Sequence, residues 1–242
     1  MKNRDLIKIS IIIPCYNEKN TLIKIINKII LSLNNYNFKS YEILIVDDGS
    51  SDGTTEIIKE NFSIKNNFKT FFHDKNLGKG AAIKTAKNNL SGDIIIIQDA
   101  DLEYDPSDYM KLLKFIIKGY KVVYGSRVLG KNRYLSSNFS SFMRIFYNHV
   151  LTVLSNNLNN QNLTDAHTCY KMFKSDIFKS IKLNENGFSF CPEITTKIGL
   201  KKIKIIEVPI KYSGRSYQDG KKITYLDGFR AIKSLFKYRF FY

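Results

Sequence analysis

The sequence that decides the fold is IIIIQDADLE, residues 94–103. Four consecutive isoleucines, preceded by a Ser-Gly-Asp turn signal, are typical of a strand that is buried on both faces of a parallel sheet. Asp99 and Asp101 follow this run, and residues two apart on an extended backbone point to the same side. Neighbouring carboxylates repel each other unless a cation lies between them, and the hard ions Mg²⁺ and Mn²⁺ suit carboxylate oxygens best. We therefore expect a divalent cation at the carboxyl end of this strand, where open α/β sheets bind their ligands.

The first half of the chain alternates strands and helices. Apolar runs predict strands at residues 8–13, 42–46, 69–72, 94–97 and 122–125. Residues 20–33 and 78–90 repeat apolar side chains with the helical period, and Asp105 followed by Pro106 predicts the start of another helix. This alternation predicts an α/β protein with a Rossmann-like architecture, in which a mostly parallel central sheet is flanked by helices.

The second half has longer helices and fewer strands. We expect helices at residues 138–158, 175–181, 192–200 and 226–238, and strands at residues 168–173 and 203–208. The chain shows no internal repeat, low-complexity linker or domain boundary. We therefore expect a single domain over residues 1–242.

The composition is that of a globular protein with a strong positive charge. Of the 242 residues, 43% are hydrophobic, and the formal net charge is +16. Residues 201–242 hold eleven Lys or Arg against three acids, a net charge of +8. Such a face attracts polyanions, which include nucleic acid, acidic lipid and phosphorylated substrates.

The cysteines and the apolar segments bear on the cellular location. Cys15, Cys169 and Cys191 are odd in number and widely spaced, so they indicate neither a disulfide framework nor a zinc site. The apolar run at residues 9–13 is too short for a signal peptide, and no stretch approaches the about 20 apolar residues of a spanning helix. We expect a cytoplasmic protein, peripheral at the cytoplasmic face of a membrane.

Three predicted strands end in polar residues that should meet at one edge of the sheet. The first ends in PCYNE (residues 14–18), the second in Asp47 and Asp48, and the third in the D-x-D sequence. A solvated acidic turn would explain D-x-D alone, but its neighbours favour a shared site. The chain has neither G-x-G-x-x-G nor G-x-x-x-x-G-K-[ST], so neither a dinucleotide fold nor a P-loop is indicated. Acids suit ribose hydroxyls, base donors and a metal, and basic residues from elsewhere would help to hold a diphosphate.

The motifs at these positions resemble those of family 2 glycosyltransferases. They are IIIPCYNE (11–18), VDDGSSDGT (46–54), NLGKG (76–80), DAD (99–101) and GSR (125–127). The second half resembles the dolichol-phosphate mannosyltransferase and polyprenyl-phosphate sugar transferase branch. The residues that carry this are TD (164–165), TCYK (168–171), EVP (207–209), GRSY (214–217) and DGKK (219–222). The resemblance covers nearly the whole chain, in order.

The resemblance implies a GT-A fold. It also implies a metal-dependent, inverting transfer of a sugar from a nucleotide-diphosphate sugar to a polyprenyl phosphate, which is dolichyl phosphate or undecaprenyl phosphate. Residues about 1–130 would bind the nucleotide sugar, and residues about 131–242 would form the acceptor side. The implied donor contacts are Pro14, Tyr16, Glu18, Val46, Asp48, Asp99 and Ala100. Asp99, Asp101 and Glu103 would hold Mg²⁺ or Mn²⁺, with Glu103 standing where many relatives carry Gln.

Basic residues and one further acid complete the implied site. Arg127, Arg215 and Lys221 match positions that clamp the donor or acceptor phosphates, and fixed cations stabilise the charge of a departing diphosphate. We expect catalysis to depend on Asp101, Arg127 and Asp165. If the acceptor is a hydroxyl of a lipid-linked or cell-surface glycan, Asp165 would be the general base, because a hydroxyl must lose its proton. A lipid phosphate is already anionic, and Asp165 would then orient a neighbour or the metal.

Two other interpretations concern the positive charge. A basic, aromatic-rich chain could bind nucleic acid, but the acidic strand ends would repel a phosphate backbone and no nucleic-acid motif is present, so we expect no such partner. Residues 229–242 mix Lys and Arg with Phe, Tyr and Leu, the composition of an interfacial helix. A solvated charged face over a packed aromatic stripe has the same composition. Because the branch acts on lipid acceptors, we expect membrane contact. Most of its members carry transmembrane helices after this point, so we expect this chain either to dock peripherally or to be held by a partner.

Overall fold

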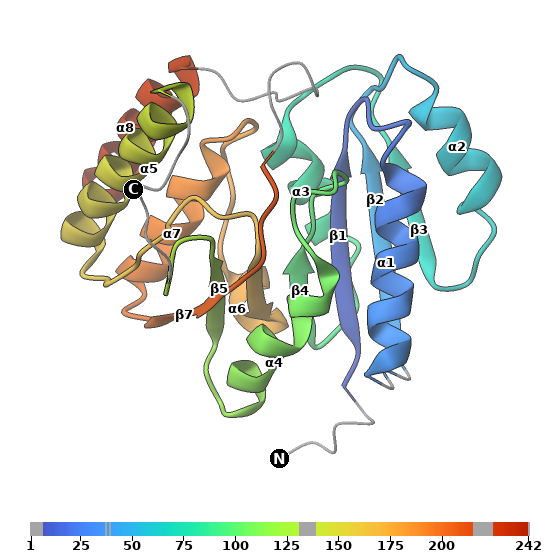
Figure 1. Ribbon diagram of the computed structural model, residues 1–242, viewed down its shortest axis with the longest axis horizontal. Helices are drawn as coiled ribbons and strands as arrows, with labels where there is room; N and C mark the ends of the chain where they lie inside the picture. Colours follow the sequence, from blue (N-terminus) through green and yellow to red (C-terminus); the bar gives the residue numbers. More distant parts are fainter. Residues whose placement is uncertain (1–6, 37, 39, 131–138, 215–224, 242) are drawn as a thin grey trace.

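The structure is a computed structural model that describes residues 7–36, 38, 40–130, 139–214 and 225–241, with the backbone alone for residues 139–144 and 225. The described residues form one seven-stranded sheet in the order β3-β2-β1-β4-β6-β5-β7 (Figure 1). Its strands are β1 (Ile9–Cys15), β2 (Tyr41–Asp47), β3 (Phe68–Phe72), β4 (Ile94–Ile97), β5 (Val122–Ser126), β6 (Lys171–Lys174) and β7 (Ile205–Pro209).

All of these strands except β6 run in one direction. β1 pairs in parallel with β2 and β4, β2 with β3, and β5 with β7. β6 is antiparallel to both of its neighbours, β4 and β5. Since β4 and β5 are both antiparallel to β6, they run in the same direction as each other. The carboxyl ends of β1, β2, β4 and β5 therefore share one edge of the sheet. The prediction of a mostly parallel central sheet is confirmed.

Helices flank the sheet, as predicted. They are α1 (Leu22–Asn35), α2 (Thr54–Asn61), α3 (Lys79–Lys87), α4 (Tyr109–Ile117), α5 (Phe139–Asn159), α6 (Ser175–Ser180), α7 (Phe190–Leu200) and α8 (Tyr225–Phe240). In Figure 1, α1 and α4 cover the near face and α3 lies behind the sheet, while α5, α7 and α8 pack against one another at the β7 end. Within the described segments, no helix has the length and apolar character needed to span a bilayer.

The isoleucine run forms the centre of the core. Each residue of β4 is at most 4% exposed, and the isoleucines of β1 are at most 1% exposed. The two strands pair in register, with Ile11 opposite Ile96 and Ile12 opposite Ile97. Full burial of one such side chain contributes about 1.5–3 kcal/mol. The strand that carries Asp99 and Asp101 beyond its end is therefore held firmly on both faces.

Two local details differ from the predictions. The strand expected at residues 168–173 forms only as β6, because the backbone N–H of Cys169 donates to the hydroxyl of Tyr104 at 3.0 Å and so leaves the ladder. The helix expected after Asp105 begins with a 3₁₀ turn, Pro106–Asp108, before α4. The predicted cap is confirmed, since the Asp105 carboxylate accepts the N–H of Ser107 at 2.9 Å.

Candidate active site

The turns after β1 and β2 are joined by hydrogen bonds. Asn17 has a φ of +50°, and its backbone N–H donates to the Ser50 hydroxyl at 2.8 Å. Its side-chain oxygen accepts the N–H of Ser51 at 2.8 Å. The N–H of Glu18 donates to the Thr54 hydroxyl at 2.9 Å. The two motifs that resemble a nucleotide site in sequence thus form one unit at the sheet edge.

The predicted donor contacts in these segments differ in exposure. Pro14 and Tyr16 are partly exposed at the end of β1, whereas Glu18 is buried. The side chains of Val46 and Ala100, 0% and 3% exposed, pack in the hydrophobic core. Val46 and Ala100 could therefore meet a ligand only through their backbone atoms.

Asp48, predicted to hold the base or ribose, organises a neighbouring loop. Its buried carboxylate accepts the backbone N–H groups of Leu77 at 3.0 Å and Gly78 at 2.7 Å. It also contacts Nδ1 of His73 at 2.7 Å, and Nε2 of the same ring contacts the Thr85 hydroxyl at 2.9 Å. His73 was not predicted from the sequence. Its position directly after a predicted strand, like that of the other polar strand ends, was the signal that could have found it.

The Gly78-Lys79-Gly80 sequence starts α3 in close contact with the loop before α7. A Cβ on Gly80 would overlap the carbonyl oxygen of Glu185, and a Cβ on Gly78 would lie 2.5 Å from the carbonyl oxygen of Asn186. Gly78 also has a φ of +101°, which a side chain disfavours. Only glycine permits this approach, and Lys79 is thereby fixed as the first residue of the helix.

Lys79 forms an ion pair with Asp99 at the end of β4. Its Nζ contacts Oδ1 of Asp99, and the two side chains are 16% and 20% exposed. The same Nζ lies 3.4 Å from Sγ of Cys169. Burial alone would lower the pKa of Lys79, but the charge of Asp99 outweighs it and raises this pKa well above its ordinary value. The lysine is therefore a cation at the point where the sequence predicts a metal.

The three predicted metal ligands are not gathered into one cluster. Oδ1 of Asp101, a buried residue, accepts the N–H of Glu103 at 3.0 Å, while Oε2 of Glu103 accepts the Tyr212 hydroxyl at 2.9 Å. Across the part of the chain that the structure describes, no group of three Asp, Glu, His or Cys side chains could hold a metal ion. Tyr212 contacts the carboxylate of Glu103, the expected third ligand, and the role of Glu103 in binding a metal stays a prediction. Asp99 and Asp101 still fit Mg²⁺ or Mn²⁺, since such ions commonly use one or two carboxylates and take their other ligands from substrate phosphates and water.

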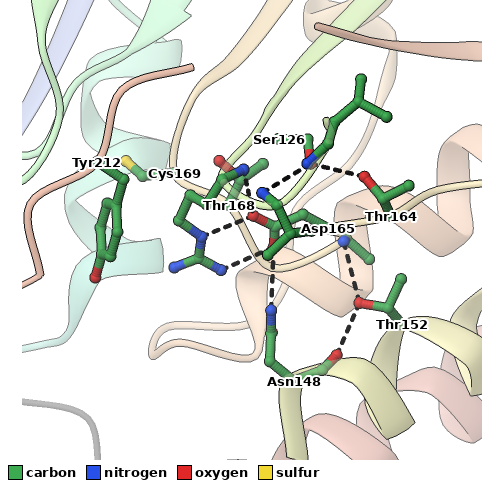
Figure 2. A network of polar contacts seen from close by, with 12 residues as sticks. Ser126, Asn148, Thr152, Thr164, Asp165, Thr168, Cys169 and Tyr212 are labelled. Atoms are coloured by element: carbon green, nitrogen blue, oxygen red, sulfur yellow. Dashed lines mark hydrogen bonds and ion pairs between the residues drawn. The ribbon is translucent and has the colours of Figure 1, made fainter. Parts of the chain in front are cut away.

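An ion pair joins Arg127, which follows β5, to the buried carboxylate of Asp165, which Figure 2 labels. Nε of Arg127 donates to Oδ2 at 2.7 Å, and Nη2 donates to Oδ1 at 2.8 Å. Asp165 is fully buried, which would raise the pKa of its carboxyl, but the charge and hydrogen bonds of Arg127 hold this pKa well below its ordinary value. A carboxylate in this state positions Arg127 and is poorly suited to take a proton as a general base.

Residues from two further elements fix Asp165. Asn148 of α5 donates to Oδ1 at 3.1 Å (Figure 2). The backbone N–H groups of Thr164 and Asp165 donate to the carboxylate of Glu207, in β7, at 2.6 and 2.8 Å. Burial raises the pKa of Glu207 despite these hydrogen bonds. Glu207 was named from the sequence only within a motif, and Asn148 was missed because it lies within a helix that has no motif.

Tyr212 connects the residues after β4 to Arg127. The guanidinium carbon of Arg127 lies 5.1 Å from the centre of the Tyr212 ring, a cation–π arrangement. The Tyr212 hydroxyl donates to Glu103 at 2.9 Å. The ring of Tyr104 packs edge-on against Tyr212, with the centroids 5.2 Å apart. Neither tyrosine was identified from the sequence as part of the site.

The remaining predicted residues, Arg215 and Lys221, fall outside the described residues, so their role as a phosphate clamp stays a prediction. Within the described part, Asp99, Asp101 and Arg127 lie at the carboxyl ends of β4 and β5, on the same edge of the sheet. This edge combines acidic strand ends with two cations held in ion pairs.

Comparisons with known proteins identify a family. The model described as "Glycosyl transferase family 2" matches residues 10–182. The dolichol-phosphate mannosyltransferase of Pyrococcus furiosus is 30% identical over 236 residues, covering 96% of this chain and 64% of that protein. The undecaprenyl-phosphate 4-deoxy-4-formamido-L-arabinose transferase of Edwardsiella ictaluri is 26% identical over 214 residues, covering 88% and 62%. The chain spans less than two thirds of the length of these relatives.

Solved structures share the fold at low sequence identity. The glucosyl-3-phosphoglycerate synthase of Mycobacterium tuberculosis, crystallised with Mn²⁺, UDP and phosphoglyceric acid, has a TM-score of 0.66 at 16% identity, covering 97% of this chain and 79% of that one. The mannosyl-3-phosphoglycerate synthase of Rubrobacter xylanophilus has a TM-score of 0.66 at 18% identity, covering 96% and 73%. The GT-A fold predicted from the sequence is confirmed.

Proposed function

The chain belongs to glycosyl transferase family 2, and on this premise we propose that it transfers a sugar, with inversion, from a nucleotide-diphosphate sugar to a polyprenyl phosphate. Two relatives named for transfer to dolichol phosphate and undecaprenyl phosphate support this acceptor class. The polar residues at the ends of β1, β2 and β4 support a donor site at their shared edge, because open α/β sheets bind ligands there.

The observation that carries the choice of acceptor is the Arg127–Asp165 pair. A hydroxyl acceptor would need a base with a pKa near the working pH. Asp165 is fully buried, binds Arg127 through both carboxylate oxygens and has a lowered pKa. A phosphate acceptor is already anionic and needs a fixed cation instead. Arg127 can supply it, since a guanidinium has more N–H donors than this pair uses.

In the proposed reaction, an acceptor phosphate oxygen attacks the anomeric carbon, the bond from that carbon to the diphosphate breaks, and a nucleoside diphosphate leaves. Arg127 binds the acceptor phosphate, and Asp165 and Tyr212 fix the plane of its guanidinium. Asp99 and Asp101 would hold Mg²⁺ or Mn²⁺, which when bound supplies positive charge to the departing diphosphate. A held guanidinium costs no reorganisation at the moment of reaction, which is the main advantage of a preorganised site.

The test is release of nucleoside diphosphate from a panel of UDP-, GDP-, dTDP- and CDP-sugars. Each donor is run with Mg²⁺, Mn²⁺ or a chelator, and with or without polyprenyl phosphate. We expect release that needs both the cation and the lipid phosphate. Asp101→Asn should lower turnover by orders of magnitude, whereas the control Asp105→Asn should not, because Asn also caps a helix start. Release that needs a glycan hydroxyl instead of the lipid phosphate would contradict the proposed acceptor, and no donor binding at all would contradict the activity.

We further infer that α5 and α8 contact a membrane surface on which the acceptor resides. On α8, Ala231, Leu235 and Tyr238 face the protein, whereas Phe229, Phe236 and Phe240 are 73%, 41% and 61% exposed. Phe146, Val150 and Val153 give α5 a second exposed apolar stripe, and the two helices pack together (Figure 1). Arg230, Lys233, Lys237 and Arg239 lie between the exposed phenylalanines of α8. Apolar side chains flanked by cations suit the surface of anionic lipid.

Vesicle flotation tests this contact. We expect the protein to float with vesicles that contain anionic phosphatidylglycerol, less with neutral vesicles, and less at high salt. Replacing Phe229, Phe236 and Phe240 with Ser should reduce the bound fraction at least about tenfold, since each loses buried apolar area in the bilayer interface. Leu31→Ser, which alters a side chain of α1 that is 60% exposed, is the matched control. Equal loss in both variants, or in neither, would contradict the proposal.

A further inference from the structure

The Lys79–Asp99 ion pair occupies the place where the proposed function requires a divalent cation. Nζ of Lys79 contacts Oδ1 of Asp99, and neither side chain is more than 20% exposed. An ammonium and a divalent cation at the same carboxylate repel each other, so the contact with Lys79 weakens the binding of a cation to Asp99. The lysine and the metal therefore compete for Asp99.

The fold fixes Lys79 in this position. Gly78 and Gly80 pack against the carbonyl groups of Asn186 and Glu185, where a side chain would overlap. The N–H of Ala81 donates to the Asn186 carbonyl at 2.9 Å, which holds the first turn of α3 to the same loop. The backbone of Lys79 thus stays in place, and only its side chain can move away from Asp99.

A displaced Lys79 needs another anion. Its second contact in the described part of the chain is the Cys169 thiol, at 3.4 Å. Burial raises the pKa of this thiol well above its ordinary value, so it stays neutral and is a weak acceptor. A diphosphate beside Lys79 would offer the ammonium a full negative charge.

We propose that Lys79 is a built-in competitor for the metal position, which leaves Asp99 when a diphosphate arrives and so makes cation and diphosphate binding cooperative. Without diphosphate, the lysine weakens cation binding. With diphosphate, the ammonium exchanges Asp99 for a phosphate oxygen, and Asp99 becomes available to the cation. The proposal rests on the proposed function, because it assumes that both ligands bind at this edge.

The test is to titrate the full chain with Mn²⁺ and to measure the free Mn²⁺ by its electron paramagnetic resonance signal. Lys79→Met should bind Mn²⁺ alone on the order of tenfold more tightly than the wild type, the factor that a charge-assisted hydrogen bond gives. Lys79→Arg keeps the charge and should bind like the wild type. Lys84→Met removes a partly exposed charge, which contacts the Asn184 carbonyl, from the same helix and is the second control. If Lys79→Met does not fold, Lys79→Gln repeats the comparison.

The cooperativity is measured by adding UDP or GDP at saturation. In the wild type the nucleotide should tighten Mn²⁺ binding by a larger factor than in Lys79→Met, with the difference again about tenfold. If Lys79 acted only through its positive charge, Lys79→Met would change the Mn²⁺ affinity by the same factor with and without nucleotide. The factor by which nucleotide tightens Mn²⁺ binding would then be the same in both proteins.

Each outcome separates this proposal from the function on which it rests. Equal Mn²⁺ affinity in wild type and Lys79→Met, with binding abolished by Asp101→Asn, would overturn the competition and leave the metal-dependent function intact. Nucleotide binding that needs no metal and is lost in Lys79→Met would also overturn the competition, because the lysine would then take the place of the divalent cation. Absence of Mn²⁺ binding in every variant, with and without nucleotide, would overturn both.

Discussion

Replacing Asp165 with Asn would test whether this carboxylate positions Arg127 or acts as a base. Asn has the same shape but no charge, and one of its two terminal groups becomes a donor. In either orientation that group would face a donor of Arg127, and at the Oδ1 position it would also face the donor of Asn148. The guanidinium of Arg127, whose side chain is 20% exposed, would lose its counter-charge and one of its two charge-assisted hydrogen bonds to Asp165.

The magnitude can be worked from these contacts. Breaking a buried ion pair by removing one partner costs about 3–5 kcal/mol. Arg127 keeps some contact with water, so we expect the lower end, about 3 kcal/mol in the free energy of unfolding by urea near neutral pH. The folded pKa of Asp165 lies below its ordinary value of 3.8, so its contribution is present above that pH. It is lost as the pH falls through the lower, folded pKa. Asn148→Ala, which removes one neutral donor from the same carboxylate, should cost only about 1 kcal/mol.

The kinetic outcome separates the two roles of Asp165. If it positions Arg127, the Asn variant should raise the KM for polyprenyl phosphate and leave the acid limb of the pH–rate profile in place. If Asp165→Asn is as stable as the wild type, keeps the same KM and loses turnover together with the acid limb, then Asp165 acts on the acceptor proton. Such a result would refute the choice of a phosphate acceptor.

Three further predictions concern other contacts of the site. Gly80→Ala should lower the free energy of unfolding by about 1–3 kcal/mol, because its Cβ would overlap the Glu185 carbonyl. A Cβ on Gly187 has open space, so the control Gly187→Ala should change this free energy by less than about 0.5 kcal/mol, and urea unfolding of both variants measures the difference. Tyr212→Leu should raise the KM for polyprenyl phosphate about tenfold and Tyr212→Phe much less, since Phe keeps the ring beneath Arg127; equal effects in steady-state kinetics would contradict this. Burial lowers the pKa of His167 from 6.5 to about 4, so the unfolded chain takes up a proton that the folded protein excludes. The wild type should therefore lose up to about 3 kcal/mol of stability as the pH falls from 6.5 to 4, and His167→Gln should lack this loss when urea unfolding is compared at the two pH values.

The features that could be predicted from sequence are those with a local cause. The isoleucines of β4 specify a doubly buried strand by their composition, and the carboxylates that come after it must lie at its end. The position of β6 could not be predicted, because its four residues pair with β4 and β5, which precede it by tens of residues. Periodicity gives the existence of a strand but not its neighbours.

The contacts inside the site could not be predicted for a related reason. Lys79 and Asp99 are 20 residues apart, and Arg127 and Asp165 are 38 residues apart. The sequence names each partner but not the pairing, so Asp165 was compatible with a general base as well as with an orienting role. Glu103 was predicted as a metal ligand, but its contact with Tyr212, which lies more than a hundred residues later in the chain, could not be predicted.

These pairings explain how an acidic sheet edge could accept the two anionic substrates of the proposed function. The strand ends carry carboxylates that would repel a diphosphate and a lipid phosphate if they stood alone. Lys79 neutralises Asp99, and Arg127 neutralises Asp165, so the repulsion is reduced before any substrate binds. The two pairs differ in how firmly they are held. Arg127 binds both carboxylate oxygens of the fully buried Asp165, which suits a permanent clamp. Lys79 and Asp99 are both partly exposed and are joined through one oxygen, which suits a contact that opens when a cation and a diphosphate bind together.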